Sequence, residues 1–504
     1  MKLAFIHLQR WLNGTFNSVF LRFCVVLLAA LSSGANFVVG QTPTVVLNDQ
    51  AVIRPVTKRV GLNIGSISFY DTGQVLKNLI GSMNPGFEPL IDQQVWVLTK
   101  AGTTTSFVEP DKYDSVQLNY WAGATFKVLA SQSGGAELGC TGMIASNSSP
   151  NFPTSTASYT NPVLTTSQPC ASAFAIGDVI QVSMSFASTP ESWWEGSKGG
   201  IWAQVAGGGK LLSNNADLCA TCGMQSLDLD ATATGSTATV TSYFDTAPLQ
   251  NMFVLMNGTY QISFWAKNAS GSPTLAIEAS RLSKKGFDCG VQDQQLTSVW
   301  TRYTLSCVAS ESAKKTEPGN AYVSFTVTGG AVYLDNLNFQ KTGTDPTNTT
   351  VFRDEVFNAL KTFYSVGSGG NPGVLRDWLG QNGETYANWT APEYAHRPSA
   401  SGAGYFIGPN GSGQTQLSLE DYLNLCVAVN AEPYLEIPVT ITERDAANLI
   451  EFLAGPTASA GGSRRAALGQ IAPWTSEFGQ IHLEYCNECW NGTSFAGQSL
   501  SFRS

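Results

Sequence analysis

The feature of this 504-residue sequence that most constrains its fold is a change of hydrophobic periodicity along the chain. Between residues 83 and 341, short runs of alternating apolar and polar residues are separated by turn residues, which is typical of a β-sandwich or jelly roll. Before and after this region, strand-length apolar runs alternate with helical segments, which is typical of a parallel α/β architecture. We therefore predict a multidomain chain, with a β-sandwich (jelly roll) inserted into, or lying beside, a partial (β/α)8 TIM barrel.

Four parts of the chain are expected: an export signal at residues 1–40, the first barrel strand and helix at 41–82, the β-sandwich at 83–341 and the partial barrel at 342–504. In the second part, a buried strand is expected at residues 59–65 and a helix at 75–80. In the fourth part, helices are expected at 351–363, 417–430 and 443–453, and strands at 374–376, 432–438 and 480–485. This part is shorter than the ~250 residues of a complete barrel, so we expect an incomplete one.

The first 40 residues have the pattern of a cleaved export signal. Lys2, Arg10 and Arg22 precede an apolar run at residues 23–31, and small residues follow it. The alternative is a membrane anchor, because the charged region is unusually long. Cleavage predicts a secreted protein, extracellular or periplasmic. Past this segment no apolar run approaches the ~20 residues of a spanning helix, so no stable membrane partner is expected.

The charge balance argues against a nucleic-acid partner. The chain has 28 Lys+Arg against 37 Asp+Glu, and only 13% of its residues are charged. It therefore lacks the basic stripe that neutralises phosphate groups.

The ten cysteine residues fit an exported protein. The pairs closest in sequence are Cys140/Cys170, Cys219/Cys222 and Cys289/Cys307, although sequence does not determine connectivity. A zinc site built from Cys219, Cys222, Cys486 and Cys489 is the alternative. We do not favour it, because the two Cys-x-x-Cys pairs lie in regions that look like different domains.

The sharpest local feature is the segment at residues 482–490, an apolar strand that ends in Asn487-Glu488 with Trp490 just beyond. In a barrel, side chains at the C-terminal ends of strands face the active site. A carboxyl group such as Glu488, beside an aromatic ring and an amide, would have a raised pKa and act as a general acid. Paired carboxylates in one site carry out glycoside hydrolysis. The alternative is an ordinary surface loop.

The sequence from Gly373 onwards resembles glycoside hydrolases of the α-L-arabinofuranosidase type (family 51 and its clan A relatives). The matching segments lie at residues 373–376, 418–426, 430–435, 465–469 and 484–488. The resemblance implies that Glu488 is the acid/base and that Asn487 binds the sugar beside the scissile bond. It also places Arg376 at a strand end near the site; a structural ion pair is the alternative role for Arg376. Trp490 is a further candidate for substrate binding.

The sequence departs from this family in several places. Cys486 and Asn430 stand where the family usually has Gly, and residues 377–379 replace a Pro-Gly-Gly segment. The family's nucleophile is a Glu near the end of the seventh strand, which we expect to be absent from this chain. Glu436, near a strand end, is the candidate here for a second carboxylate.

The middle region resembles carbohydrate-binding jelly rolls of families 4 and 9. The matches are an opening strand at residues 84–88, a strand at 257–267 and a closing strand at 333–337. Such modules often hold a structural calcium ion, and the resemblance makes Glu88 and Asp335 its possible ligands. The alternative is that both are ordinary surface carboxylates. Aromatic residues that could stack on sugar rings include Trp193, Trp194, Trp202 and Trp300.

Together these features predict a secreted, retaining glycoside hydrolase that acts on arabinose-containing plant polysaccharides and needs no cofactor for catalysis. The expected partner is a polysaccharide or oligosaccharide. The alternative is a non-catalytic carbohydrate-binding protein with a vestigial half-barrel. A third possibility is a structural surface protein without sugar affinity. Asn-x-Ser/Thr sequons, including those at Asn257, Asn388 and Asn491, would be glycosylated only in a host that performs this reaction.

Overall fold

The computed structural model describes residues 61–64, 75–81, 84–89, 91–110, 118–132, 138–149, 160–185, 203–205, 207–245, 256–281, 286–311, 321–367, 372–377, 385–397, 417–437 and 441–485. The chain divides into two compact units, Met1–Thr57 and Lys58–Ser504, and every described residue belongs to the second. The predicted export signal and the motif residues Asn487, Glu488 and Trp490 lie outside the described residues. Among the helices that are described, none is long and apolar enough to cross a membrane.

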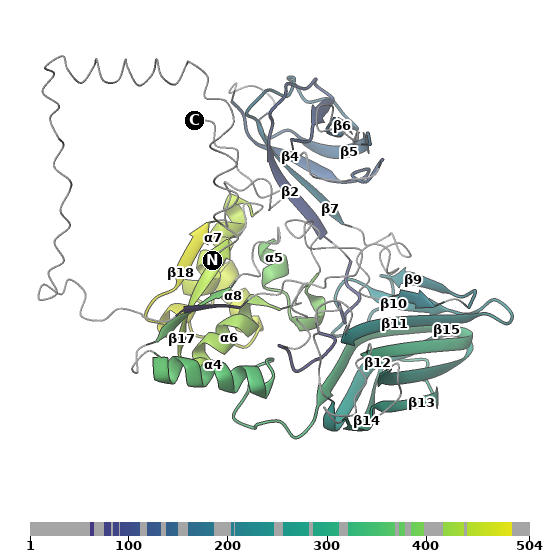
Figure 1. Cartoon of the computed structure of the whole chain (residues 1–504). Helices are drawn as coiled ribbons and strands as arrows, with labels where there is room; N and C mark the ends of the chain where they lie inside the picture. The colour runs from purple at the N-terminus through teal and green to yellow at the C-terminus, as the bar shows by residue number, and fades with distance from the viewer. Residues whose placement is uncertain are drawn as a thin grey trace, which may run out of the picture. The chain divides into compact units, whose positions relative to one another are not determined.

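Strands predominate in the described part of the chain and form three sheets (Figure 1). The first is a four-stranded parallel sheet in the order β1 (Gly61–Ile64), β16 (Gly373–Asp377), β17 (Ala431–Ile437) and β18 (His482–Tyr485). β1 pairs with β16, although both other sheets lie between these strands in the chain. The predicted strands of the α/β parts are therefore confirmed, and the strand before the middle region joins those after it.

The expected burial of the first strand is wrong. The four residues of β1 are half-buried or exposed. Among the described strands β1 has one neighbour, β16, and lies at an edge of the sheet. An edge strand is covered less completely than a central one, which explains its exposure.

The helices associated with the parallel sheet are α4 (Asp354–Gly367), α5 (Tyr386–Trp389), α6 (Leu419–Val429), α7 (Glu443–Ala454) and α8 (Ala460–Ala467). The three predicted helices correspond to α4, α6 and α7 and are confirmed. α6 begins after Ser418, whose side chain accepts a hydrogen bond from the backbone N–H of Asp421. It ends at Asn430, whose φ of 58° is left-handed. Asn tolerates this conformation better than most residues other than Gly.

The helix predicted at residues 75–80 is wrong. These residues form turns and an isolated antiparallel bridge between Leu76 and Phe352. The backbone N–H of Leu79 donates to the Phe339 carbonyl rather than to a carbonyl four residues earlier. Leu76 packs in the core beside the parallel sheet, whereas Leu79 packs in the core of another sheet. Burial in two different cores overrides the local helical spacing.

Residues 84–88, expected to be an opening strand, form a tight turn. The side chain of Asn84 closes it, because Oδ1 accepts from the Glu88 N–H and Nδ2 donates to the Glu88 carbonyl, both at 2.8 Å. Asn84 and Phe87 have positive φ angles of 50° and 51°, which do not occur in a regular strand. The turn carries the Glu88 side chain into the protein interior.

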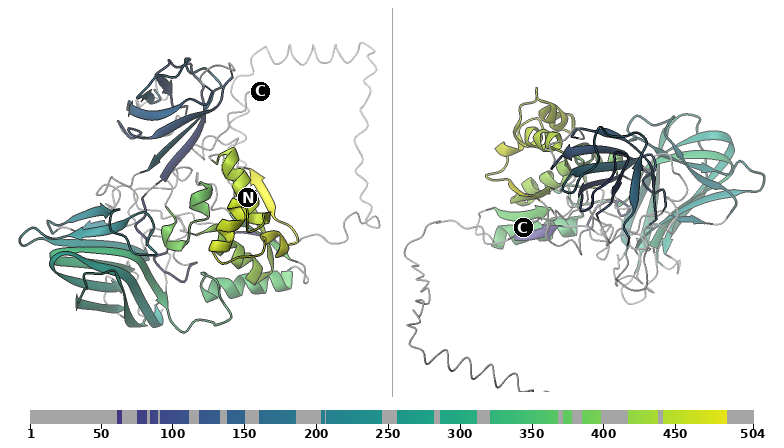
Figure 2. Two further views of the ribbon diagram at one scale, coloured as in Figure 1. Left: turned by 180° about the vertical axis from the view of Figure 1, so that it is seen from behind. Right: turned by 90° about the horizontal axis from the view of Figure 1, so that it is seen from above.

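The middle region contains two antiparallel sheets with separate hydrophobic cores. The six-stranded sheet consists of β2 (Ile91–Val97), β3 (Ser106–Val108), β4 (Thr125–Ala130), β5 (Thr141–Asn147), β6 (Val163–Thr166) and β7 (Val179–Ser185). The eight-stranded sheet consists of β8 (Ala203–Val205), β9 (Lys210–Asn214), β10 (Ser226–Asp230), β11 (Thr237–Asp245), β12 (Asn257–Arg281), β13 (Asp288–Gln294), β14 (Thr301–Ser310) and β15 (Ala321–Lys341). The long strands β12 and β15 pair along most of their length, and Figure 2 shows the teal-to-green sheet to which they belong from two further sides.

Within the described part of the chain, three disulfides join Cys140 to Cys170, Cys219 to Cys222 and Cys289 to Cys307. They are the pairings closest in sequence, which sequence analysis left open. The sulfur atoms of Cys219 and Cys222 are bonded to each other, so they cannot act as thiolate ligands of zinc. Cys486 and Cys489 lie outside the described residues.

Candidate active site

The parallel sheet has one apolar and one polar face, because side chains alternate along each strand. Leu375 and Leu435 lie on the apolar face and are fully buried in a core that they share with α4, α6 and α7. The register places these polar residues on the other face: Asn63, Arg376, Glu432, Tyr434, Glu436, His482 and Glu484. Parallel sheets are usually buried on both faces, so these polar groups must find partners there.

Arg376, Glu436 and Glu484 meet at the carboxyl ends of their strands. Each is the last residue but one of its strand. Nη2 of Arg376 lies 2.6 Å from Oε2 of Glu484 and 3.5 Å from Oε2 of Glu436. The Glu436 side chain is fully buried, whereas those of Arg376 and Glu484 keep 17% and 27% of their surface exposed. One guanidinium thus holds two carboxylates at the sheet end where barrels bind their ligands.

An aromatic pair supports this guanidinium. The rings of Tyr434 and His482 stack with centroids 5.7 Å apart and an interplanar angle of 17°. The guanidinium carbon of Arg376 lies 5.7 Å from the centroid of the Tyr434 ring, within the range of a cation–π contact. His482 Nε2 in turn lies 3.3 Å from Oε2 of Glu432. Contacts from β17, its neighbour in the sheet, and from β18, the next strand along, therefore set the orientation of Arg376.

These contacts suit a positioning role better than acid catalysis. Glu436 and Glu484 both accept hydrogen bonds from Arg376. A general acid must instead offer a proton to the leaving group. Neither carboxyl is arranged to do so, and each instead holds the guanidinium in place.

Sequence reasoning found part of this cluster. It named Arg376 and Glu436, which lie together. It did not single out Glu484, although the alternation of His482 and Glu484 about Leu483 indicates a polar strand face.

The two predicted calcium ligands are in the middle region, and the alternative that they are surface carboxylates is wrong. Both Glu88 and Asp335 are fully buried. Oδ1 of Asp335 accepts from the backbone N–H of Asn336 at 2.7 Å, but its buried Oδ2 has no hydrogen-bond partner among the described residues. Both oxygens of Glu88 accept from the backbone N–H of Met224, at 2.9 and 3.0 Å.

Burial makes the charged forms of both carboxyl groups costly, a cost that a bound cation would offset. Burial raises the pKa of Glu88 to about 7 and that of Asp335 well above its usual value. Two buried carboxyl groups with an unpartnered oxygen offer the hard oxygen ligands that Ca²⁺ prefers. The sulfur atoms of Cys219 and Cys222 lie within 4.8 Å of an Asp335 carboxylate oxygen, but they are joined in a disulfide and cannot bind a cation as thiolates.

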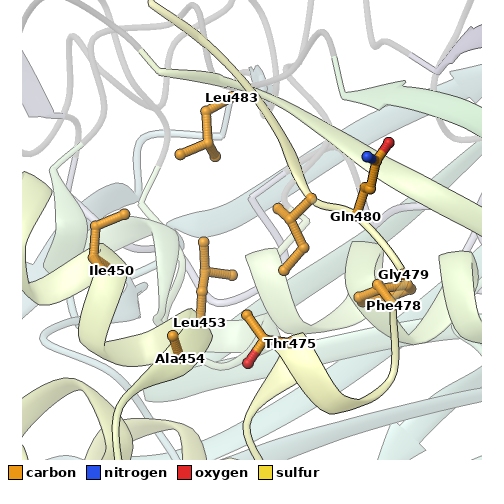
Figure 3. A pocket seen from close by; sticks show the side chains of 9 residues that line it. Ile450, Leu453, Ala454, Thr475, Phe478, Gly479, Gln480 and Leu483 are labelled. Carbon is orange, nitrogen blue, oxygen red and sulfur yellow. The ribbon is translucent and has the colours of Figure 1, made fainter.

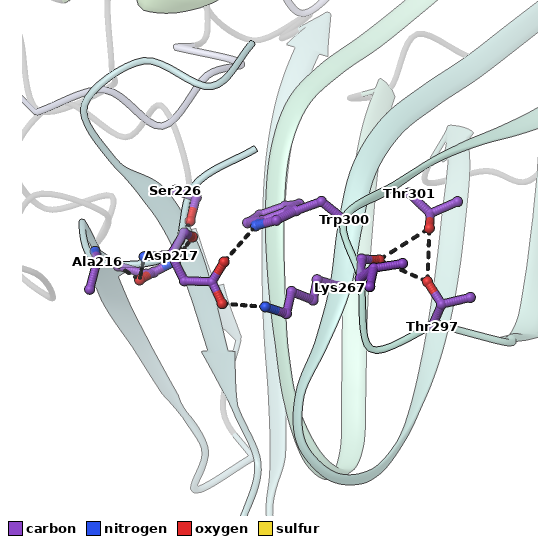
Figure 4. Close-up of polar contacts among 9 residues, drawn as sticks. Ala216, Asp217, Ser226, Lys267, Thr297, Trp300 and Thr301 are labelled. Carbon is purple, nitrogen blue, oxygen red and sulfur yellow. Dashed lines mark hydrogen bonds and ion pairs between the residues drawn. The ribbon is translucent and has the colours of Figure 1, made fainter. Parts of the chain in front are cut away.

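The eight-stranded sheet carries an aromatic and charged surface cluster, shown in Figure 4. The ring of Trp300 stacks against Tyr333 with centroids 6.2 Å apart, and its Nε1 donates to Oδ1 of Asp217 at 3.0 Å. The Lys267 ammonium pairs with Oδ2 of the same carboxylate and lowers the pKa of Asp217. Trp300 and Tyr333 are half-buried, so part of each aromatic surface remains open.

An apolar pocket of about 260 Å³ lies on the opposite face of the parallel sheet from Arg376 (Figure 3). The lining residues include Leu453 of α7, Leu483 of β18 and Phe478, which precedes β18 in the chain. The residues that line it include no ionisable side chain, so this pocket offers no acid or base.

No family model matches the sequence, and no curated protein matches it. Among solved structures, the chain is similar to an arabinose-bound MgGH51 α-L-arabinofuranosidase, with a TM-score of 0.37 and 16% identity over 57% of this chain and 47% of that one. It is also similar to TmCBM61 in complex with β-1,4-galactotriose (TM-score 0.21, 12% identity, 29% of this chain and 91% of that one). A third is the CBM22-1 xylan-binding domain of Paenibacillus barcinonensis Xyn10C (TM-score 0.20, 19% identity, 30% and 91%). The chain spans about half the length of the arabinofuranosidase.

Proposed function

We propose that this chain is a secreted, retaining glycoside hydrolase of the α-L-arabinofuranosidase type, acting on arabinose-containing plant polysaccharides. Its four-stranded parallel sheet would be part of a (β/α)8 barrel into which the β-rich region is inserted. The observation that carries the proposal is the Arg376–Glu436–Glu484 cluster at the carboxyl ends of three parallel strands. Glu488 follows Glu484 by four positions in the sequence.

In this proposal the residues have separate roles. Glu488 protonates the leaving glycosidic oxygen while a nucleophilic carboxylate, which none of the described residues is proposed to supply, bonds to the anomeric carbon. Glu488 then activates the water that releases the sugar from this carboxylate. Asn487 binds the sugar beside the scissile bond, and Trp490 provides an apolar wall. Glu436 and Glu484 hold Arg376 toward the substrate. Because Glu436 is fully buried and paired with Arg376, it suits this role better than nucleophilic attack on a sugar.

The test is hydrolysis of an aryl α-L-arabinofuranoside by the full chain. Glu488→Gln is expected to reduce the rate by at least ~100-fold, because general acid–base catalysis contributes ~10²–10⁴-fold. Glu443→Gln, at an exposed position in the first turn of α7, is the matched control and should leave the rate unchanged. Equal rates for the wild-type chain and Glu488→Gln, or no hydrolysis by either, would contradict the proposal.

A second candidate function is carbohydrate binding without catalysis. The observation that favours it is the partly open Trp300–Tyr333 pair beside Asp217 and Lys267, since aromatic faces stack on sugar rings and charged groups bond to hydroxyls. Retention of the chain on an insoluble arabinose-containing polysaccharide, with no hydrolysis of any aryl glycoside, would favour this function over the first.

We also propose that Glu88 and Asp335 hold a structural calcium ion. A bound cation would offset the cost of burying two carboxylates. Adding Ca²⁺ to chain treated with a chelator should raise its Tm by several degrees. Asp335→Asn should abolish this rise, whereas Asp293→Asn, at an exposed position of β13, should preserve it. A Tm that does not respond to Ca²⁺ would contradict the site.

A further inference from the structure

The described part of the chain contains Asn-x-Ser/Thr sequons in very different environments. They begin at Asn147, Asn257, Asn268, Asn348 and Asn388. The sequence alone does not separate them, because each has the acceptor pattern. Attachment of a glycan replaces one hydrogen of the Asn side-chain amide and needs open space around Nδ2. The structure therefore distinguishes acceptors by the burial and the hydrogen bonds of this nitrogen.

In three of these sequons the Asn side chain is buried in the folded protein. Asn147, Asn348 and Asn388 are at most 4% exposed. Nδ2 of Asn348 donates to the Phe352 carbonyl and to Oδ1 of Asp354, both at 2.8 Å, so both of its hydrogens are in use.

The other two buried amides are also engaged. Nδ2 of Asn388 donates to the Arg397 carbonyl at 2.9 Å, and Nδ2 of Asn147 to the Ser148 carbonyl at 3.0 Å. A glycan at Asn147, Asn348 or Asn388 would break these bonds and have no room, so a chain that carried it would not reach this structure.

Asn257 is different. It is the first residue of β12 and is exposed, as are Gly258 and Thr259 of the same sequon. The register places it opposite Ser310 of β14, which is also exposed. Asn268 is intermediate, because it is half-buried and its Nδ2 lies 3.4 Å from the Gly271 carbonyl.

We propose that Asn257 is an N-glycosylation site and that Asn147, Asn348 and Asn388 stay unmodified. The proposal rests on the export proposed above. The donor is an oligosaccharide linked to a lipid diphosphate. Nδ2 of Asn257 attacks C1 of its first sugar, an N–C bond forms, the C1–O bond to the diphosphate breaks, and Nδ2 loses one proton as the lipid diphosphate leaves.

A glycan at this position is compatible with sugar binding by the same sheet. Asn257 and Lys267 lie ten positions apart in β12, which corresponds to about 30 Å along a strand. The glycan would instead lie beside Thr259 and the exposed Val308 opposite it, where it would cover an apolar side chain of β14.

The test is expression of the full chain in a eukaryotic secretory cell, followed by peptide mapping of the secreted protein. Enzymatic glycan release in ¹⁸O-water converts a glycosylated Asn into labelled Asp. Label is expected at Asn257 and not at Asn147, Asn348 or Asn388. Thr259→Ala, which removes the sequon, should abolish the label at Asn257, whereas Thr259→Ser should retain it.

Three results would overturn the proposal in distinguishable ways. A secreted chain without label at Asn257 would overturn this site while leaving export intact. Label at Asn348 or Asn388 in a folded, secreted chain would overturn the structural criterion. A chain that stays unglycosylated in the cytosol would overturn export itself, and with it the proposed secreted function.

Discussion

Arg376 of β16 reaches across β17 to Glu484 of β18, where its Nε and Nη2 donate to the same carboxylate oxygen at 2.8 and 2.6 Å. The Arg376 guanidinium also lies near the Tyr434 ring and beside the fully buried carboxylate of Glu436. The pair therefore ties together strands that are not adjacent. It also gives the end of the sheet a fixed charged group, on which a substrate can be oriented.

Replacing Arg376 should destabilise the chain. Arg376→Met removes the guanidinium that lies 3.5 Å from the buried carboxylate of Glu436, and removing one member of a buried ion pair costs about 3 kcal/mol or more. Arg353→Met is the matched control, because its partner Glu355 is 65% exposed, against 0% for Glu436, and such a pair should contribute about 1 kcal/mol or less. Urea denaturation of both variants measures the difference. Equal losses of unfolding free energy would contradict the central role of Arg376.

His396 should contribute a loss of stability in mild acid, opposite in sign to the contribution of a buried carboxyl group with a raised pKa such as Glu88. Burial lowers the pKa of this side chain from 6.5 to about 4. Between these values the unfolded chain binds a proton that the folded chain does not, so the free energy of unfolding decreases as the pH falls. The loss begins near pH 6.5, reaches about 3 kcal/mol and is complete below about pH 4.

The His396 contribution can be isolated by substitution. His396→Gln cannot titrate, so denaturant unfolding of this variant at pH 7 and pH 4.5 should show a smaller decrease than that of the wild-type chain. The same decrease in both chains would assign the acid sensitivity to other groups.

Sugar affinity in the β-rich region should depend on the ring of Trp300. Trp300→Ala removes the face that stacks on Tyr333 and the donor to Asp217. Affinity for an arabinose-containing polysaccharide should drop about tenfold, or ~1.4 kcal/mol. Trp300→Phe should retain most of the affinity, and Val299→Ala, at a 64% exposed neighbour, should retain all of it. Affinity electrophoresis compares the three; unchanged migration of Trp300→Ala would place sugar binding elsewhere.

The disulfides should contribute unequally to stability. Cys140 and Cys170 are 30 positions apart, whereas Cys219 and Cys222 are 3 apart. Because a cross-link restricts the unfolded chain more when it closes a longer loop, replacing the first pair by Ser should cost about 4 kcal/mol and replacing the second about 2 kcal/mol. Thermal unfolding of the two double variants tests this order, and a larger loss for the Cys219/Cys222 variant would reverse it.

Regular elements were the most predictable from sequence. Strands such as β12 and β17 and helices such as α6 and α7 combine a clear period with caps or turns at their ends. The helix predicted at residues 75–80 is wrong because Leu76 and Leu79 pack in two different hydrophobic cores. The strand predicted at residues 84–88 is wrong because the Asn84 side chain closes a turn there, which an alternating sequence pattern does not reveal.

The candidate site was only partly predictable for a similar reason. Alternation marks Arg376 and Glu436 as residues on strand faces, but it does not show which strands are neighbours. The approach of Arg376 to Glu484 across β17 depends on the sheet order and on a parallel register. Likewise, Glu88 and Asp335 are both buried, although Glu88 follows a turn and Asp335 lies in β15, far away in the sequence.

Sequence by itself determined the kinds of element and their order, because hydrophobic period, caps and turn residues act over a few neighbouring positions. It also identified the cysteine pairs nearest in sequence as candidates for disulfides. Only the tertiary structure decided that β1 joins β16, that one guanidinium holds two carboxylates, and that Asn257 is open while Asn348 and Asn388 are buried. Those outcomes arise from contacts between distant segments, whose free energy depends on packing and burial rather than on local pattern.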